Sequence, residues 1–346
     1  MINGKFGFGL VGCGLISVFH AKAIKHSNRM KLISVTDLDS NRANKIADEF
    51  DCKIESFDNM LNNPDIDIIN VLTPNAYHSD FVIKAAKAKK HVIVEKPPEM
   101  VLSKVDKMIE VGKENKVKIT VSLQCRFRKA IEAIKKAYDE GRFGKIIYSS
   151  AYMKWYRPQE YYKMDKWRSL KNEGAGVTIQ QAFHYLDLII YLTGDVDRVY
   201  AKMLNIAHPN VELEDTVQAF LEFKNGAIGS LEATTACYPG IDIRIEICGE
   251  NGLAVMKGDR IEEWKFKDEL PYDEDIRKIG DPNSPTASQG AAALSFIEHN
   301  YLFEDFIDSI IYDRNPRVTL EEGRRTLEVA LKLYESAEKN EWVKIK

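Results

Sequence analysis

The sequence predicts two α/β domains, an N-terminal Rossmann parallel sheet and a C-terminal α/β domain with an open, mostly antiparallel sheet. Three observations lead to this fold class. Short apolar runs alternate with helical stretches in the first third of the chain. A glycine-rich turn follows the first apolar run. After about residue 195, several apolar runs follow one another without helices between them.

Composition narrows the class of protein. The 346 residues exceed one ordinary core, and we expect domains at 1–123 and 124–346. With 45% hydrophobic and 29% charged residues the chain is typical of a globular protein, and a net charge of −3 gives no reason to expect nucleic acid or membrane partners. The start enters an apolar strand directly and is not a signal peptide, which favours a cytoplasmic protein. Five cysteines without metal-binding spacing imply reduced thiols and no metal.

Periodicity places the elements of the first domain. The expected strands are Phe6–Val11, Lys31–Thr36, Ile66–Leu72, His91–Glu95 and Val117–Ser122. The expected helices are Ile16–Lys25, Ser40–Phe50, Tyr77–Ala88 and Val101–Asn115.

The second domain has a different order of expected helices and strands. Helices are expected over Lys129–Glu140, Gly174–Leu192, Ser295–Tyr312 and Leu320–Lys339. Strands are expected over Lys145–Lys154, Val196–Ile206, Thr216–Phe223, Ala227–Ala233 and Ile241–Cys248, and a polar loop is expected over residues 268–290. Asn225-Gly226 is a hairpin signal, which favours antiparallel pairing.

The turn Gly12-Cys13-Gly14-Leu15-Ile16-Ser17 stands between the first strand and the first helix. A dinucleotide fold needs glycines there, one for the tight turn and one for close approach of the backbone to the pyrophosphate. Ser17 replaces the third glycine of the usual pattern. An ordinary glycine-rich turn is the alternative interpretation.

Asp37 closes the second expected strand, about twenty residues beyond the glycines. A carboxylate there binds the adenosine ribose hydroxyls and repels a 2′-phosphate, which favours NAD over NADP. Arg42 could soften this preference. Asp37 could instead be a helix-capping or turn aspartate, a part that Asp39 could equally play.

Two further motifs follow strand ends, Thr73-Pro74-Asn75 with His78, and Glu95-Lys96-Pro97. Together with Gly12-Cys13-Gly14 they resemble the Gfo/Idh/MocA family of sugar and polyol dehydrogenases, and the resemblance extends to the closing Glu321-Glu322-Gly323-Arg324-Arg325. It implies NAD as cofactor and Lys96 at the reacting carbon, often followed by a cis Lys-Pro bond. Burial and the positive cofactor should lower the pKa of that lysine.

The resemblance also implies a set of cofactor contacts. These are Gly12, Gly14, Leu15, Ile16, Asp37, Thr73, Pro74, Asn75, His78, Glu95, Lys96, Gln124, Trp167 and Arg168. An open sheet with one uncovered face needs a partner surface, and the family commonly buries it in dimers and tetramers, so we expect a homo-oligomer.

The stretch from Gly174 to Asp187 is similar to the second signature of the family. Gln180, His184 and Asp187 are spaced i, i+4, i+7, which predicts one shared helical face. Many family members carry aspartate at the first of these positions. Glutamine cannot titrate, so proton transfer must rest on Lys96 and His184, while a structural role is expected for Asp187.

The segment from Trp155 to Tyr162, with Trp167-Arg168 and the Gln-Gln-x-x-His helix, resembles the bacterial enzymes that oxidise UDP-N-acetylglucosaminuronic acid at C3. Such a substrate carries a diphosphate and a carboxylate, which suits Arg157, Arg168 and Lys163 as anion partners. The expected substrate contacts are Lys96, Arg157, Lys163, Gln180, Gln181 and His184. An aromatic surface loop with solvated charges is the alternative.

Two other functions stay open. The substrate could be a free sugar, an inositol or another polyol. The chain could also be a non-catalytic regulator that binds a dinucleotide as a signal, since the family includes such members. A regulator has little use for Lys96 together with His184, and both are present.

Overall fold

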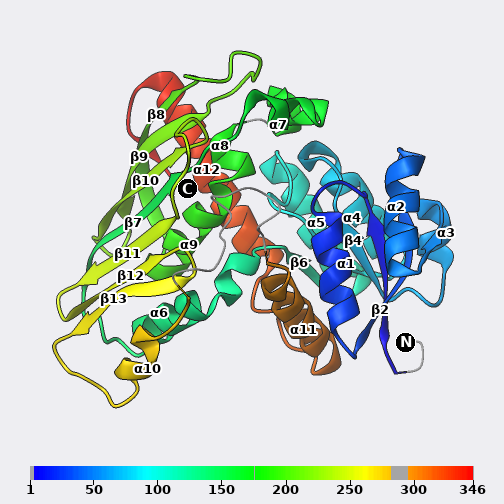
Figure 1. Ribbon diagram of the computed structural model, residues 1–346, viewed down its shortest axis with the longest axis horizontal. Helices are drawn as coiled ribbons and strands as arrows, with labels where there is room; N and C mark the ends of the chain where they lie inside the picture. Colours follow the sequence, from blue (N-terminus) through cyan, green and yellow to red (C-terminus); the bar gives the residue numbers. More distant parts are fainter. Residues whose placement is uncertain (1–3, 175, 282–294, 346) are drawn as a thin grey trace. The chain divides into compact units, whose positions relative to one another are not determined.

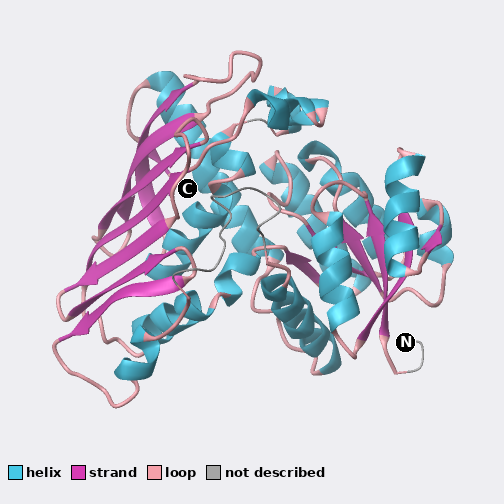
Figure 2. Ribbon diagram, viewed as in Figure 1, coloured by secondary structure: helices cyan, strands magenta, loops and turns pink. Residues whose placement is uncertain are grey.

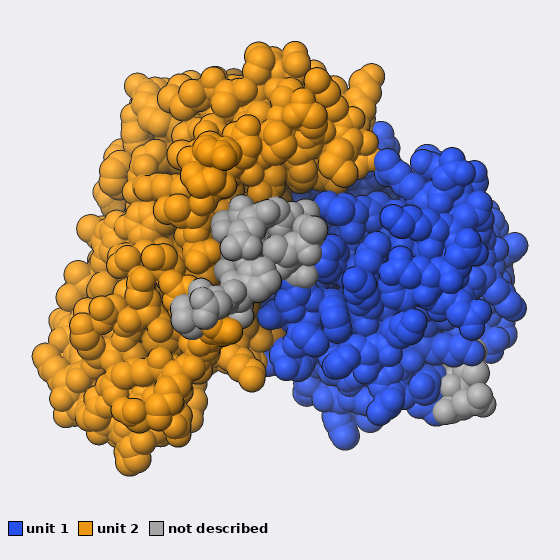
Figure 3. Space-filling view, in the orientation of Figure 1, with its two compact units in different colours: residues 1–124, 295–325 blue, residues 125–294, 326–346 orange. Residues whose placement is uncertain are grey.

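The computed structural model describes residues 4–174, 176–281 and 295–345. They form two compact units, coloured separately in Figure 3. Unit 1 holds the described residues up to Gln124 together with Ser295–Arg325, and unit 2 holds the others. The expected division at residue 123 differs for Ser295–Arg325. The reason is packing: α11 (Ile297–Ile311) contacts α1 (Ser17–His26), and the Asn300 amide donates to the carbonyl of Ala23 over 3.0 Å.

Unit 1 contains a six-stranded sheet in the order β3-β2-β1-β4-β5-β6, parallel throughout, as predicted (Figure 1). Its strands are β1 Phe6–Val11, β2 Met30–Thr36, β3 Lys53–Ile54, β4 Ile68–Val71, β5 His91–Val94 and β6 Ile119–Val121. The helices after them are α1, α2 Ser40–Phe50, α3 Phe57–Asn62, α4 His78–Lys87 and α5 Leu102–Asn115.

Two elements of this unit, β3 and α3, were not predicted. β3 has two residues, both exposed, so no apolar run marks it. Every residue of β1 is buried, by contrast, because β1 lies in the middle of the sheet.

The register of the sheet positions the site. Val11 is paired with Thr36 and with Val71, and Val71 with Val94. The residues that follow these four strand ends therefore meet at the carboxyl edge of the sheet. The strand order also reverses between β1 and β4, and such a switch point is where open α/β sheets bind ligands.

Unit 2 contains an eight-stranded sheet in the order β13-β12-β11-β7-β10-β9-β8-β14. Its pairs are antiparallel except β7 with β10, which confirms the mostly antiparallel prediction. The strands are β7 Ile146–Lys154, β8 Val196–Leu204, β9 Thr216–Phe223, β10 Ile228–Thr234, β11 Arg244–Gly249, β12 Gly252–Lys257, β13 Arg260–Phe266 and β14 Val343–Lys344. In Figure 2 the helices described for this unit lie over one face of the sheet.

The helix expected over Gly174–Leu192 is wrong as one continuous element. The structure has α8 Val177–Gln180 and α9 Phe183–Thr193. The backbone N–H of Ala182 donates to the carbonyl of Val177, five residues back, over 2.8 Å. One extra residue is therefore accommodated between the two helices, a π-type irregularity that often marks functional sites. Gln180 and His184 thus do not share one regular helical face.

The remaining helices of unit 2 are α6 Lys129–Asp139, α7 Gln159–Lys163 and α10 Asp273–Arg277; α12 Leu320–Lys339 begins in unit 1 and continues into unit 2. The expected loop at 268–290 contains α10, and its part from 282 onward lies outside the described residues. Across 4–174, 176–281 and 295–345, no helix combines the length and the apolar character that a membrane crossing requires.

Candidate functional site

The turn after β1 has the backbone geometry that a phosphate-binding turn needs. Gly12 adopts φ +102°, and a Cβ there would lie 2.7 Å from the carbonyl oxygen of Leu72. A side chain is therefore excluded at this position. A Cβ on Gly14 would meet no atom within 4 Å, so the backbone there is open to an approaching group. Ser17 Oγ donates to the carbonyl of Gly14 over 2.6 Å and closes the turn onto α1.

Asp37 is joined to this turn. Its Oδ2 accepts from the backbone N–H of Cys13 over 2.6 Å, and its Oδ1 accepts from the N–H of Asp39 over 2.8 Å. Asp39 is the N-cap of α2 and accepts from Asn41 N–H over 3.0 Å. The capping role therefore falls to Asp39, and Asp37 keeps its place at the carboxyl end of β2. Burial and the Asp37 charge raise the pKa of the Cys13 thiol to about 12, so this thiol stays protonated.

His78 links the Thr73 motif to the Lys96 motif through hydrogen bonds. It is fully buried, its Nδ1 lies 2.9 Å from the carbonyl of Pro97, and its Nε2 lies 2.8 Å from the carbonyl of Thr73. Burial lowers the pKa of His78, although both carbonyls favour its charged form. The expectation that His78 contacts the cofactor does not fit this burial. Its side chain instead holds the Thr73 turn against the turn that follows Lys96.

Lys96 follows β5 at the same carboxyl edge, and its bond to Pro97 is cis. Glu95, before it, is buried and accepts from His20 Nε2 over 2.9 Å and from the N–H of Lys96 over 3.2 Å. Burial alone would raise the pKa of Glu95, but the hydrogen bond from His20 holds it well below its usual range. The carboxylate is thus committed to shaping the Lys96 turn.

One cluster in unit 1 has metal-binding residue types. Single ligand atoms of His20, Glu95 and His299 lie within 4.8 Å of one another. The Asn70 amide donates to His20 Nδ1 over 3.1 Å, so Nε2 carries the ring proton and donates the hydrogen bond to Glu95. A metal ion would need a lone pair on Nε2, and that nitrogen has none to offer while it carries the proton. We therefore interpret Asn70, His20 and Glu95 as a hydrogen-bond network behind Lys96. The His299 ring packs on the His20 ring with 4.9 Å between centroids, and burial lowers the pKa of His299 to about 3.

Gln124 and the predicted contacts Pro74 and Asn75 follow β6 and β4 at this same edge. Asn75 is buried, whereas Gln124 is half-buried and its Oε1 has no hydrogen-bond partner among the described residues. Leu15 is 38% exposed beside the glycines. The carboxyl edge thus brings together the unit 1 residues that the sequence singled out.

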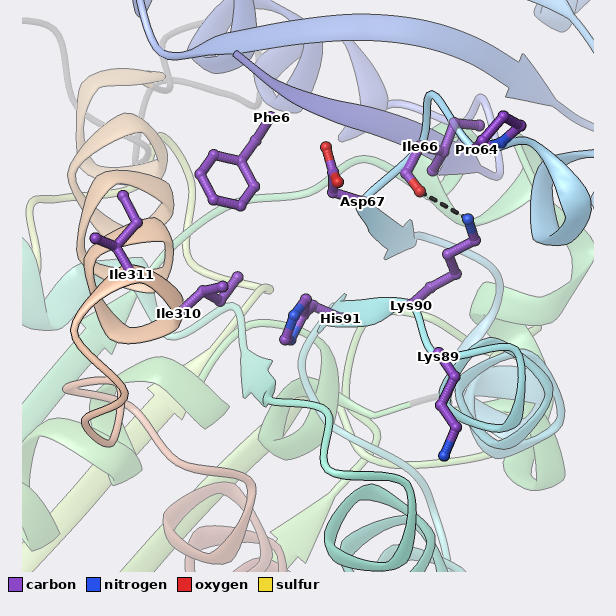
Figure 4. A pocket seen from close by; sticks show the side chains of 9 residues that line it. All are labelled: Phe6, Pro64, Ile66, Asp67, Lys89, Lys90, His91, Ile310 and Ile311. Carbon is purple, nitrogen blue, oxygen red and sulfur yellow. Dashed lines mark hydrogen bonds between the residues drawn. The ribbon is translucent and has the colours of Figure 1, made fainter. Parts of the chain in front are cut away.

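A hollow at the opposite edge of this sheet is not part of that arrangement (Figure 4). Phe6 and His91, which line it, begin β1 and β5. Lys90 Nζ is held by the carbonyls of Asn63 and Ile66, each over 2.8 Å. Because these strands present their amino ends here, we do not assign the cofactor to this hollow.

In unit 2, Tyr161 lies among the predicted substrate residues. Its hydroxyl accepts from Arg168 Nη1 over 2.9 Å and from Gln181 Nε2 over 3.4 Å. The guanidinium carbons of Arg157 and Arg168 lie 5.8 Å and 4.8 Å from the centre of its ring. Gln180 Nε2 donates to the carbonyl of Arg168 over 2.7 Å. Arg157, Arg168, Gln180 and Gln181 therefore lie together around Tyr161, and we call these five residues the substrate wall. Tyr161 was not among the residues predicted from the sequence.

Both guanidinium groups are largely buried. Arg157 is 7% exposed and stacks over the Trp155 ring at 4.9 Å, and burial lowers its pKa. Arg168 is 8% exposed, and its Nε and Nη2 each lie 3.3 Å from Asp165 Oδ2. Trp167 lies under the Arg168 guanidinium at 4.7 Å. Lys163, by contrast, is exposed at the end of α7.

The Arg157 backbone is held by a buried pair. His208 Nε2 lies 2.7 Å from the carbonyl of Arg157, and His208 Nδ1 lies 2.8 Å from Asp215 Oδ2. Asp215 also accepts from the N–H groups of Ile206 and Ala207, which lower its pKa against the effect of burial. The segment that carries Arg157 is thus fixed by a buried polar network.

His184 is the second residue of α9 and is half-buried. One helical turn on, Asp187 is 1% exposed and accepts from Arg126 Nε and Nη2, each over 2.7 Å, and from Thr326 Oγ1 over 2.9 Å. A bidentate buried pair of this kind anchors the helix. Asp187 is therefore committed to structure, whereas His184, one turn earlier, is the candidate for chemistry on this helix.

Comparisons with known proteins agree with this arrangement. Residues 6–123 match the family model described as "Oxidoreductase family, NAD-binding Rossmann fold", and residues 131–255 match "GFO/IDH/MocA C-terminal domain". The WlbA dehydrogenase from Bordetella pertussis, solved with NADH and UDP-GlcNAcA, is 31% identical with a TM-score of 0.90 over 100% of this chain and 99% of that one.

Two more relatives are similar to this chain. The WlbA enzyme from Chromobacterium violaceum, also with NADH and UDP-GlcNAcA, is 29% identical with a TM-score of 0.89 over 100% of this chain and 97% of that one. The scyllo-inositol 2-dehydrogenase (NAD(+)) of Bacillus subtilis strain 168 is 31% identical over 254 residues, 70% of this chain and 71% of its own length. The chain belongs to the Gfo/Idh/MocA family of NAD-dependent oxidoreductases.

Proposed function

We propose that this dehydrogenase oxidises a secondary alcohol of a nucleotide sugar, and that its substrate is a UDP-linked N-acetylhexosaminuronic acid oxidised at C3. The observation that carries the proposal is the wall in which Arg157 and Arg168 flank Tyr161. A diphosphate and a carboxylate offer such planar cations bidentate partners. Lys163, exposed nearby in sequence, is a further candidate for the diphosphate.

The relatives support this substrate class. The two WlbA enzymes were solved with UDP-GlcNAcA, and they match this chain over its whole length. Gln180 and Gln181 add amide groups that can orient sugar hydroxyls without exchanging protons. Gln180 already donates to the Arg168 carbonyl, which ties the orienting group to the anion-binding one.

The chemistry follows from the residue types. Oxidation of a secondary alcohol to a ketone releases one hydride from carbon and one proton from oxygen. NAD supplies the hydride acceptor when it is bound. Lys96 receives the hydroxyl proton, with His184 as its partner in proton transfer, because Gln180 cannot titrate. Glu95 and His78 act indirectly, since one fixes the start of the Lys96 turn and the other its end.

Unit 1 offers the cofactor contacts. The glycine turn suits the pyrophosphate, Asp37 the adenosine ribose, and the Thr73 and Glu95 turns the nicotinamide end. The proposed direct contacts are Gly12, Gly14, Leu15, Ile16, Asp37, Thr73, Pro74, Asn75, Lys96 and Gln124. For Trp167 and Arg168 the structure favours the substrate wall, since Arg168 contacts Tyr161.

A free inositol or sugar is the second candidate, because the Bacillus subtilis relative acts on scyllo-inositol. The test is NADH formation, followed by absorbance, with UDP-N-acetylglucosaminuronic acid, UDP-N-acetylglucosamine, scyllo-inositol and myo-inositol. We expect turnover of the UDP-linked uronic acid only. Turnover confined to the inositols would replace the proposal by the second candidate. NADH binding without turnover of any of them would favour the non-catalytic regulator.

A further inference from the structure

The short helix α8, which carries Gln180 at its end, begins against a buried carboxyl group. The N–H of Val177 donates to the backbone carbonyl of Glu214 over 2.9 Å, and the N–H of Thr178 donates to Glu214 Oε1 over 2.9 Å. The N-cap residue, Gly176, has no side chain that could do this. Glu214 therefore satisfies, from another part of the chain, the N–H groups that a helix leaves open at its start.

A tyrosine from α12 completes this arrangement. Tyr334 Oη donates to Glu214 Oε1 over 2.9 Å. Gly176 adopts φ +100°, and a Cβ on it would lie 2.6 Å from both Tyr334 Oη and Glu214 Oε2. The carboxyl and hydroxyl groups thus occupy the space beside the start of α8. Glu214 is 5% exposed, so solvent does not compete for these bonds.

The start of α8, which Glu214 and Tyr334 contact, lies one helical turn from Gln180 in the substrate wall. Gln180 ends this four-residue helix and donates to the carbonyl of Arg168. Immediately after it comes the irregular step to α9, where His184 lies. A helix of one turn has little intrinsic stability, so its placement depends on the groups at its ends.

We propose that Glu214 and Tyr334 are positioning residues that hold α8, and through it Gln180 and His184, in the geometry that binds the sugar. This inference rests on the proposed function for its kinetic consequence. Neither residue lies in the wall around Tyr161, and neither belongs to the motifs that identify the family in the sequence. Their effect should therefore fall on sugar binding, not on NADH binding.

The same bonds make the placement of α8 sensitive to protonation. Burial raises the pKa of Glu214 to about 7, and the hydrogen bonds from Thr178 and Tyr334 offset this only in part. Its Oε2 has no hydrogen-bond partner among the described residues. The titratable group that faces it is Tyr334, whose own pKa burial raises well above its usual value. Ionisation therefore places charge on a buried oxygen without a donor.

The test compares Glu214→Ala, Glu214→Gln and Tyr334→Phe with Glu222→Gln, which alters a half-buried carboxylate on β9 paired with Arg198, as the control. Glutamine keeps an Oε1 that can accept from Thr178 and Tyr334. We expect Glu214→Ala to raise the KM for the UDP-sugar by at least about fivefold, as expected for loss of a cap, with NADH affinity within about twofold of wild type. Glu214→Gln should restore most of this loss.

The pH profile separates positioning from general damage. In wild type the KM should change between about pH 6 and about pH 8, and in Glu214→Gln this change should disappear. An unchanged KM in Glu214→Ala, or an NADH affinity lowered as much as the sugar affinity, would overturn the inference. If Glu214→Ala does not fold, the inference is tested by the KM for the UDP-sugar and the NADH affinity of Tyr334→Phe and Glu214→Gln.

A readout without turnover keeps the inference independent of the substrate. Hydrogen–deuterium exchange of the peptide that spans α8 should be faster in Glu214→Ala and Tyr334→Phe than in wild type and Glu222→Gln. If no sugar is turned over by wild type but this difference is present, the proposed function fails and the hold on α8 stands. Equal exchange in all four proteins would contradict the hold itself.

Discussion

The backbone N–H of Cys13 donates a 2.6 Å hydrogen bond to the Asp37 carboxylate, which joins the glycine-rich turn after the first strand to the end of the second strand. The other oxygen of Asp37 accepts from the N–H of Asp39. A carboxylate held by two backbone N–H groups stays at a fixed place at the carboxyl edge of the sheet. We expect negative charge fixed there to discriminate against a cofactor that carries a 2′-phosphate on its adenosine ribose.

Replacing Asp37 by serine should weaken the preference for NAD. Serine keeps a short polar group but removes the charge, and Arg42 nearby in sequence can then attract the extra phosphate. We expect the KM for NAD to rise about tenfold and the ratio of kcat/KM for NADP to that for NAD to rise by more than that. Steady-state kinetics with both cofactors measure this.

The control for that experiment is Asp39→Asn, which keeps the N-cap of α2 and removes a charge of the same sign. It should leave the cofactor ratio near that of wild type. If Asp39→Asn changes the ratio and Asp37→Ser does not, the ribose contact belongs to Asp39.

Lys96→Met and His184→Ala should each lower kcat by about a hundredfold or more, because each removes a group that we propose to handle the hydroxyl proton. NADH affinity, measured by fluorescence titration, should stay close to that of wild type. Lys87→Met, at an exposed position of α4, is the matched control for loss of a lysine charge. Full turnover in either active-site variant would remove that residue from the proposed chemistry.

Local patterns predicted much of unit 1. The buried run Phe6–Val11, the glycine turn and the Lys96 turn were all visible, because a central parallel strand is apolar throughout and its end must turn sharply. The two-residue β3 was not visible, since both of its residues are exposed and only pairing with β2 defines it. Tertiary contacts alone create such an element.

In the candidate site, long-range contacts account for what the sequence did not show. His20 and Glu95 are 75 residues apart, and Thr178 and Glu214 are 36 apart, so no spacing rule connects them. In the sequence, Tyr161 is one of several aromatic residues in its segment, and only the fold shows that two arginines lie next to it. The irregular step before His184 depends on one backbone hydrogen bond, which hydrophobic periodicity does not register.

The uncovered face of the eight-stranded sheet should mediate self-association. Phe220 on β9 and Ile228 on β10 point to this face and are 54% and 53% exposed. Exposed apolar groups of this kind mark interaction surfaces. We expect light scattering to give a dimer or tetramer for wild type and a smaller species for the variant Phe220→Glu with Ile228→Glu.

Ile54→Glu, at a residue of β3 that is 50% exposed, is the control for a new surface charge and should keep the wild-type mass. A wild-type monomer at micromolar concentration would contradict self-association. An unchanged mass in the double variant would place the interface elsewhere.

The buried Glu214 carboxyl should make the free energy of unfolding depend on pH in a way that glutamine does not. Its pKa is about 7 in the folded protein against 4.5 for an unperturbed glutamate, so the folded state binds this proton more tightly than the unfolded state. Stability from this group is fully present below about pH 4.5 and is lost as the pH rises through about 7. The loss is about 3 kcal/mol at most.

Relative to Glu214→Gln, wild type should therefore become less stable between about pH 5 and about pH 8, as measured by urea unfolding at fixed protein concentration. All other titrating groups are common to both proteins and cancel in the difference. A difference that stays constant over this range would show that Glu214 is already ionised at the acidic end, and its bonds to Thr178 and Tyr334 would then have to be charge-assisted throughout.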